Sequence, residues 1–464
     1  MRPKEQERSQ PMFHYFSVED LVPDDHILRI IDKVVDFSFV HGLVKECYCP
    51  DNGRPGVYPE LVVRMILVGY LYNLSEKRLC EEVKMHAAYR WFCKLSFDDT
   101  VPDRSTLNKL RNHRWASVNL FEKIMHNIVQ QCVDAGLVSG KHLGVDGTQI
   151  RANASIKSLE PIVVPMPLDD YLHELNLIND DKKDTHPQDK DFHGTSLSNQ
   201  THRSKTDPDA RLYRKSKGKE ASLSYIGHNL IDTKSRVILA TRATHASRST
   251  EPVATLDMLS DLENFPDLYH KVKTLAADKG YGSGTFIADM LDRNITPHIP
   301  LLANEKPEPV PSWKNRTFKP HIQTKRNEKV RLAKARNYAR LISSTSEYKI
   351  SQKLRKRTEH VFAEAKICHG LDRARCRSKR SLQDQLYMTA TVQNVKRLVS
   401  FSKRKLKSVL AGTLNHISMP LSCLSFNFSN INNILFDSFH FISNKISNKF
   451  KTFILIRVYL FSLK

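Results

Sequence analysis

The chain has 464 residues, with 72 Lys and Arg against 50 Asp and Glu, which gives a formal net charge of +22. This length allows about two or three domains. The charge favours a polyanionic partner, with nucleic acid ahead of a membrane surface, because no signal peptide or lipidation motif is recognisable. The 8 cysteines form no Cys-x-x-Cys pair, so we expect reduced thiols and no zinc site.

Helical periodicity dominates the first part of the chain. Apolar residues recur at helical spacing between about residues 18 and 135, interrupted by the turn-rich segment 50–56. Ser75 is suited to cap the N-terminus of a third helix, and Asp103-Arg104-Ser105-Thr106 precedes a fourth, long periodic stretch that ends near Gly136. The sequence therefore predicts a helical N-terminal domain over residues 1–138.

From about residue 142 the pattern changes to short strands alternating with helices. The predicted strands lie at about 142–152, 222–231, 236–241, 272–277 and 295–299, and the predicted helices at 252–262 and 284–293. This order predicts an α/β domain over residues 139–400 with a mixed sheet covered by helices. Residues 155–221 are polar and are expected to form an insertion or mobile loop.

The C-terminal third is strongly basic. Residues 349–407 contain 17 Lys or Arg against 4 Asp or Glu, and predicted helices at 353–366 and 386–398 flank a basic loop. Residues 401–464 are basic and then of low complexity, and we expect this tail to be poorly ordered. Its apolar runs are too short to span a bilayer, so no membrane partner is expected.

Three acidic residues stand in settings typical of metal-holding carboxylates. Asp146 and Asp278 end apolar strand-like runs, and Glu359 lies in a predicted helix. Phosphodiester cleavage is well served by two divalent ions, and Mg²⁺ prefers a few carboxylates plus water. Each position alone also suits a turn former or a solvated helix residue. Together the three indicate a phosphoryl-transfer site.

Two cations share the helical face of Glu359. At ~100° per residue, Arg355 and Lys366 lie within ~40° of it around the helix axis. They are suited to hold phosphates on either side of a scissile bond, although the same stripe also suits surface ion pairs. Glu364 points ~140° away and is the alternative third carboxylate.

Other residues near the carboxylates suit DNA contacts. Tyr281, in the turn after Asp278, is predicted either to stack on a base or to pack beneath the turn. Arg373 and Arg375 belong to a loop-like basic series that suits phosphate binding.

With these residues the sequence resembles bacterial insertion-sequence transposases of the DDE type. Related transposases often carry a Tyr-x-x-Arg-x-x-x-Glu-x-x-x-x-x-x-Lys signature. Arg355, Glu359 and Lys366 fit it, whereas Gln352 stands at the tyrosine position. The other stretches that carry the resemblance are Val22-Pro23-Asp24-Asp25-His26, Asn52-Gly53-Arg54-Pro55, Ala88-Tyr89-Arg90-Trp91-Phe92, Val101-Pro102-Asp103-Arg104-Ser105-Thr106, Val145-Asp146-Gly147-Thr148, Ala277-Asp278-Lys279-Gly280-Tyr281 and Arg357-Thr358-Glu359-His360-Val361-Phe362.

The resemblance implies a ribonuclease-H-like catalytic domain behind the helical domain, which would help to recognise the element ends. It implies that Asp146, Asp278 and Glu359 bind two Mg²⁺ ions, with Mn²⁺ able to substitute, for cleavage of element ends and strand transfer. The implied partners are double-stranded DNA, as terminal inverted repeats and target, and further copies of the chain, in the bacterial cytoplasm with the nucleoid. Two alternatives stay open: an inactive DNA-binding remnant or repressor, and a host nuclease without joining activity.

Overall fold

The computed structural model describes residues 17–49, 51–53, 56–162, 198–215, 218, 220–247, 250–301, 307–312 and 319–417. Residues up to Ser402 form one compact unit, and residues from Lys403 form a second. The elements that position the site belong to the first unit. No helix in the described ranges is both long enough and apolar enough to cross a membrane.

The predicted helical N-terminal region is confirmed. Ser75 acts as the expected N-cap, because its side chain accepts a hydrogen bond from the backbone N–H of Arg78 (3.4 Å), and Asp103 caps a further helix by accepting one from the N–H of Thr106 (2.7 Å). The helices are α1 (Ile27–Val34), α2 (Phe39–Val44), α3 (Pro59–Leu71), α4 (Glu76–Met85), α5 (Ala87–Phe92), α6 (Arg104–Lys109) and α7 (Leu120–Asp134).

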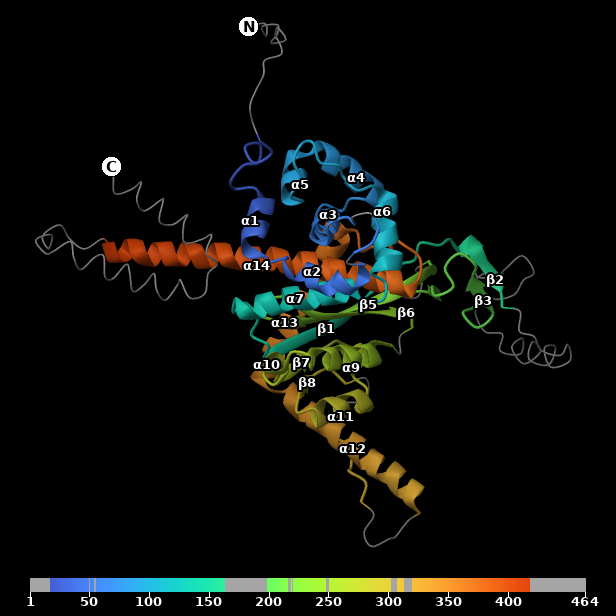
Figure 1. The fold of residues 1–464 in the computed structure, drawn as a ribbon. Coiled ribbons are helices and arrows are strands. Elements are labelled where there is room, and N and C mark those ends of the chain that lie inside the picture. Colours follow the sequence, from blue (N-terminus) through green and yellow to red (C-terminus); the bar gives the residue numbers. More distant parts are fainter. Residues whose placement is uncertain are drawn as a thin grey trace, which may run out of the picture. The chain divides into compact units, whose positions relative to one another are not determined.

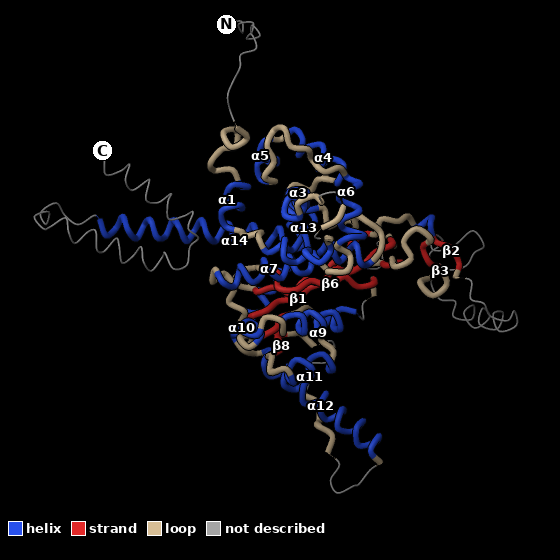
Figure 2. The backbone as a smooth tube through the Cα atoms, viewed as in Figure 1, coloured by secondary structure: helices blue, strands red, loops and turns tan. Residues whose placement is uncertain are grey.

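A mixed sheet forms the centre of the region that follows residue 141, as predicted (Figure 2). Its strands are β1 (His142–Arg151), β4 (Arg211–Tyr213), β5 (Ser222–Asp232), β6 (Ile238–His245), β7 (Thr274–Ala276) and β8 (Thr296–His298). In space they run β6-β5-β1-β7-β8, with β4 paired to the start of β5. The first three strands are antiparallel, and β7 and β8 run parallel to β1. This is a ribonuclease-H-like arrangement.

Helices cover both faces of the sheet (Figure 1). An added Cβ on Gly144 would meet Thr358 of α13 (Ser346–His369) at 3.2 Å, whereas one on Gly147 would meet Glu251 of α9 (Thr250–Leu262) at 3.4 Å. Residues 144 and 147 point to opposite faces because side chains alternate along a strand. Helices α13 and α9 therefore lie on opposite faces of β1. The other helices are α10 (Pro266–Tyr269), α11 (Gly284–Asp292), α12 (Pro320–Ser343) and α14 (Lys379–Ile417).

One hydrophobic core joins the N-terminal helices to the sheet. Met65 of α3, Val145 of β1 and Val392 of α14 belong to the same buried cluster, with exposed fractions of 0%, 0% and 1%. The boundary predicted between residues 138 and 139 thus falls inside a shared core. The N-terminal helices are held against the sheet by burial of apolar surface.

Two segments differ from the sequence prediction. The described ends of the polar stretch 155–221 are folded: β2 (Leu159–Pro161) pairs with β3 (His202–Ser204). Residues 163–197 lie outside the described residues. Helix α14 extends to Ile417, well past the predicted end at 398, and no proline or glycine interrupts residues 399–411. The rest of the predicted poorly ordered tail, from residue 418, lies outside the described residues.

Candidate active site

Strand register brings Asp146 and Asp278 level with each other. Gly144 of β1 pairs in parallel with Ala276 of β7, and each aspartate lies two residues further along its own chain. Asp146 accepts a hydrogen bond from the Gly147 N–H at 2.9 Å, and Asp278 accepts one from the Gly280 N–H at 2.8 Å. Asp146 thus lies in the middle of β1, and Asp278 follows the end of β7 directly beside it.

Glu359 approaches this site from α13, with its side chain 56% exposed. Its neighbour Thr358 packs over Gly144, which places this turn of the helix above β1. The Arg355 guanidinium donates to Glu359 Oε1 at 3.3 Å and is itself only 17% exposed. Helix α13 therefore delivers one carboxylate and one cation to the aspartates.

The electrostatics of Asp146 reflect this grouping. Burial raises the pKa of its carboxyl to about 6; the Gly147 N–H and the charge of Arg355 oppose that rise, while the charges of Asp278 and Glu359 add to it. The three predicted carboxylates therefore lie within electrostatic reach of one another. The positive charge of Arg355 partly balances the negative charges of Asp146 and Glu359. The role predicted for Arg355, holding a phosphate, stays a prediction.

The prediction of Glu364 as the alternative third carboxylate of the site is wrong. It lies on the other side of α13 and forms ion pairs with Lys396 (2.5 Å) and Arg397 (3.1 Å) of α14. Burial alone would raise the pKa of Glu364, but the bonds to His369 and Lys396 and the charge of Arg397 hold that pKa well below its usual range. Glu364 fastens α13 to α14.

The predicted DNA-binding cations have different surroundings. The Lys366 ammonium is half-buried and donates to the Gln149 carbonyl of β1 at 2.9 Å, and burial lowers its pKa. Arg373 is exposed and reaches only Asn153 Oδ1, at 3.3 Å. Arg373 therefore stays a candidate for phosphate contact, whereas Lys366 is tied to the strand that carries Asp146.

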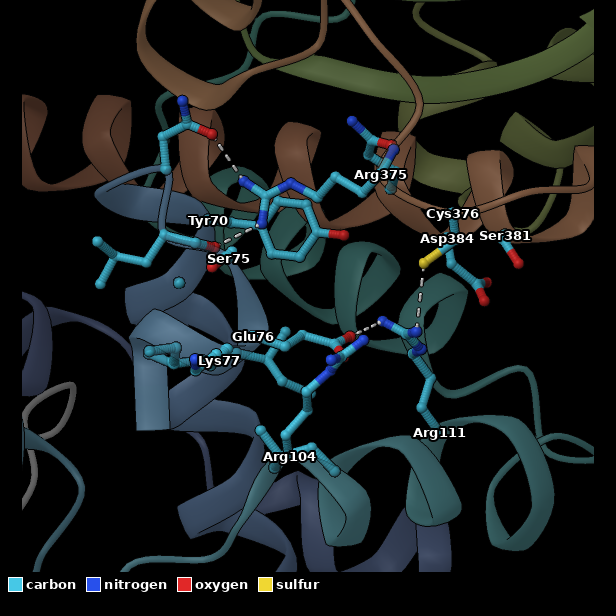
Figure 3. A pocket seen from close by; sticks show the side chains of 17 residues that line it. Tyr70, Ser75, Glu76, Lys77, Arg104, Arg111, Arg375, Cys376, Ser381 and Asp384 are labelled. Carbon is cyan, nitrogen blue, oxygen red and sulfur yellow. Dashed lines mark hydrogen bonds and ion pairs between the residues drawn. The ribbon is translucent and has the colours of Figure 1, made fainter. Parts of the chain in front are cut away.

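The Arg375 guanidinium is engaged within the protein, so its predicted contact with DNA stays a prediction. It donates to the Leu74 carbonyl and to Asn73 Oδ1, each at 3.0 Å, and lies 4.3 Å from the Tyr70 ring centroid (Figure 3). These residues belong to the α3–α4 turn and border a cavity of about 470 Å³. None of the three predicted carboxylates lines this cavity. Arg375 instead joins the basic loop to the N-terminal helices.

Replacement of Arg375 by Met is therefore expected to lower the free energy of unfolding by about 1–3 kcal/mol, because two carbonyl acceptors and one ring contact are lost. Urea unfolding monitored by circular dichroism measures this loss. Arg373→Met is the matched control: it should leave stability unchanged but reduce the salt dependence of DNA binding by about one phosphate contact. A stable Arg375→Met variant with weakened DNA binding would establish Arg375 as a DNA ligand.

Tyr281 is fully buried, with an exposed fraction of 0%. Its ring packs against Phe286 with centroids 5.9 Å apart. The structure thus favours packing beneath the turn over stacking on a base. Exposure could not be read from the sequence, because residues of a tight turn are usually at the surface.

Sequence reasoning missed Glu251, in the first turn of α9. Its two carboxylate oxygens occupy the space beside two glycines: an added Cβ would lie 3.4 Å from Oε1 at Gly147 and 3.1 Å from Oε2 at Gly280. These are the glycines that follow Asp146 and Asp278. A methyl group at Gly280 would crowd Glu251 Oε2, whereas the distance at Gly147 is an ordinary contact. No signal in the sequence pointed to Glu251.

Gln352, which replaces the signature tyrosine, also has a defined place. Its side-chain amide donates to the Ala277 carbonyl at 3.2 Å and to the carbonyl of His298. These carbonyls lie at the ends of β7 and β8, and Ala277 directly precedes Asp278. Because Gln352 precedes Glu359 by about two helical turns, it ties the helix of the glutamate to the strand end of the aspartate.

Replacement of Gln352 by Leu is expected to destabilise the protein by about 1–3 kcal/mol, because two partly buried carbonyls lose their donor. Thermal unfolding of Gln352→Leu against Lys353→Leu, at an exposed neighbouring position on α13, measures the effect. Equal melting temperatures for the two variants would show that the amide does not hold β7 and β8 to α13.

The donor set suits Mg²⁺. All candidate ligands at this site are carboxylate oxygens, which Mg²⁺ prefers. Within the described ranges no group of three or more His, Cys, Asp or Glu side chains is close enough to hold an ion ready-made. The carboxylates lie near one another but do not converge on a single point.

Comparison with known families places the chain. Residues 16–113 match the family described as Transposase domain (DUF772), and residues 177–395 match the family Transposase DDE domain. Asp278 and Glu359 lie inside the second match, and Asp146 lies between the two. No solved structure matches the chain significantly. The chain belongs to the DDE transposases of insertion sequences. Transposases act on DNA, and DDE transposases generally depend on divalent metal ions.

Proposed function

We propose that the protein cleaves the ends of its insertion sequence and joins the freed 3′-hydroxyls to target DNA. The observation that carries this proposal is the grouping of Asp146, Asp278 and Glu359 from three separate elements, such that two of the charges act on the third carboxyl. A basic chain with a net charge of +22 fits a DNA substrate. Two ends must be processed together, which favours a homo-oligomer.

Asp146, Asp278 and Glu359 are the residues that would hold two Mg²⁺ ions, with Mn²⁺ as a substitute. Bound divalent ions activate the attacking oxygen and neutralise the leaving one. Arg355 balances part of the negative charge between Asp146 and Glu359, and the exposed Arg373 is placed to contact a phosphate. The β1–β7 register and the Gln352 amide hold the carboxylate-bearing elements in place.

The test is incubation of the full chain with a duplex that carries the terminal repeat of its own element, with Mg²⁺ or EDTA and a target plasmid. We expect Mg²⁺-dependent nicking at the repeat end and a joined product. Binding without nicking would favour the inactive remnant or repressor. Nicking without a joined product would favour the host nuclease.

A further inference from the structure

The Glu251 carboxylate lies against the turn that carries Asp278. Glu251 Oε2 and Asp278 Oδ1 are 3.1 Å and 3.0 Å from the same point, the position of a Cβ on Gly280, so they are at most about 6 Å apart. The other Glu251 oxygen faces Gly147, the residue after Asp146. The Glu251 carboxylate of α9 therefore lies beside the backbone that follows both Asp146 and Asp278.

A buried hydroxyl beneath these carboxylates lacks a partner. Tyr281 is fully buried, and its hydroxyl makes no hydrogen bond of ordinary geometry with any described residue. The hydroxyl of Thr255, which donates to the Glu251 carbonyl at 2.9 Å, lies nearby but outside the geometry of an ordinary hydrogen bond to Tyr281. Besides burial, the charges of Glu251, Asp146 and Asp278 raise the pKa of Tyr281, so its hydroxyl lies within electrostatic range of all three. Buried polar groups usually have a partner, and a water on a bound ion would provide one.

We propose that Glu251 is a fourth carboxylate of the metal site and binds one divalent ion jointly with Asp278. Two carboxylates at this separation leave room for one cation between them, and their repulsion favours its binding. Glycine at 280 preserves this arrangement, because a methyl group there would lie 3.0 Å from Asp278 Oδ1 and 3.1 Å from Glu251 Oε2 and would crowd both oxygens. The inference rests on the proposed metal-dependent function and adds a ligand to it.

An acidic residue in the first turn of a helix also has an ordinary explanation, since it interacts favourably with the helix dipole. That explanation predicts an effect on stability and none on metal binding. Asp257, an exposed acidic residue on the same helix, provides a charge-matched control.

The test is a titration of the full chain with Mn²⁺ in the absence of DNA, in which electron paramagnetic resonance measures the concentration of free Mn²⁺. The variants are Glu251→Gln, Glu251→Asp and Asp257→Asn, with thermal unfolding in EDTA to verify the fold. We expect Glu251→Gln to weaken the binding of one ion at least about tenfold, Glu251→Asp to have a smaller effect, and Asp257→Asn to bind as the parent does. If Glu251→Gln fails to fold, Glu251→Asp, which keeps the charge but shortens its reach, carries the comparison.

If Glu251→Gln and Glu251→Asp bind Mn²⁺ as the parent does, the assignment of Glu251 as a fourth metal ligand is overturned and the proposed function stays intact. No Mn²⁺ binding by the parent, together with no nicking of the terminal repeat, would overturn both. An effect of the same size in Asp257→Asn would show that general loss of charge explains the result, and would overturn the assignment of Glu251.

Discussion

Replacement of Asp146 by Asn is expected to reduce Mg²⁺-dependent cleavage of the terminal repeat by at least about 10³-fold. The asparagine side chain has the same shape and can still accept a hydrogen bond from the Gly147 N–H, but it lacks the negative charge of Asp146. Binding of the repeat duplex should change little, because Asp146 is half-buried and contributes no positive charge. Gel-shift and cleavage assays on the same duplex measure both quantities. Equal cleavage by variant and parent would remove Asp146 from the site.

The same variant should be more stable than the parent near neutral pH. In the folded protein the pKa of Asp146 is raised to about 6 from its usual 3.8, so an ionised Asp146 destabilises the fold by about 3 kcal/mol. This destabilisation is absent below pH 4. It develops between pH 4 and 6, because Asp146 releases its proton at lower pH in the unfolded chain than in the folded one, and it is complete above pH 6. Unfolding in EDTA at pH 4 and at pH 7.5 should show the advantage of the Asp146→Asn variant only at the higher pH. A constant difference would contradict the burial of this carboxyl.

The second large effect separates two glutamates of α13. Glu359→Gln is expected to reduce cleavage at least about 10³-fold while changing stability by less than about 1 kcal/mol, because its side chain is 56% exposed and forms one weak ion pair. Glu364→Gln is expected to lose about 2–4 kcal/mol of stability. The Arg397 side chain is only 12% exposed, and the substitution removes the negative charge that balances it. The folded Glu364→Gln protein should cleave DNA as the parent does.

The measurements are urea unfolding and cleavage rates of both variants at a temperature where both are folded. Each glutamate serves as the control for the other, since the substitution and the helix are the same. Loss of cleavage in a fully folded Glu364→Gln protein, with normal cleavage by Glu359→Gln, would exchange their roles.

The sheet and its carboxylates could be predicted because they depend on local patterns. Apolar runs before Asp146 and Asp278 indicated strands β1 and β7, although β1 continues past Asp146 to Arg151. Parallel pairing of the two strands brings the aspartates level with each other. The helical periodicity around Glu359 was equally local. Strand order and the opposite placement of α9 and α13 came only from the structure, because they depend on pairing between distant segments.

Partnerships across the chain could not be predicted. Arg375 bonds to residues of the α3–α4 turn about three hundred positions earlier, and Glu364 pairs with a helix that begins after the basic loop. Glu251 gave no signal of its own, because an acidic residue in a first helical turn is common. Helix α12 was missed because only three alanines form its buried face, which leaves little apolar periodicity to detect.

The central claim is that Asp146, Asp278 and Glu359 form one divalent-metal site for DNA strand cleavage. Anomalous X-ray diffraction from crystals of the full chain grown with Mn²⁺ tests it most directly. The account predicts anomalous peaks within coordination distance of the carboxylate oxygens of Asp146 and Asp278, with Glu359 closing the site. Well-ordered Mn²⁺ bound elsewhere, with these three carboxylates facing away from it, would contradict the account.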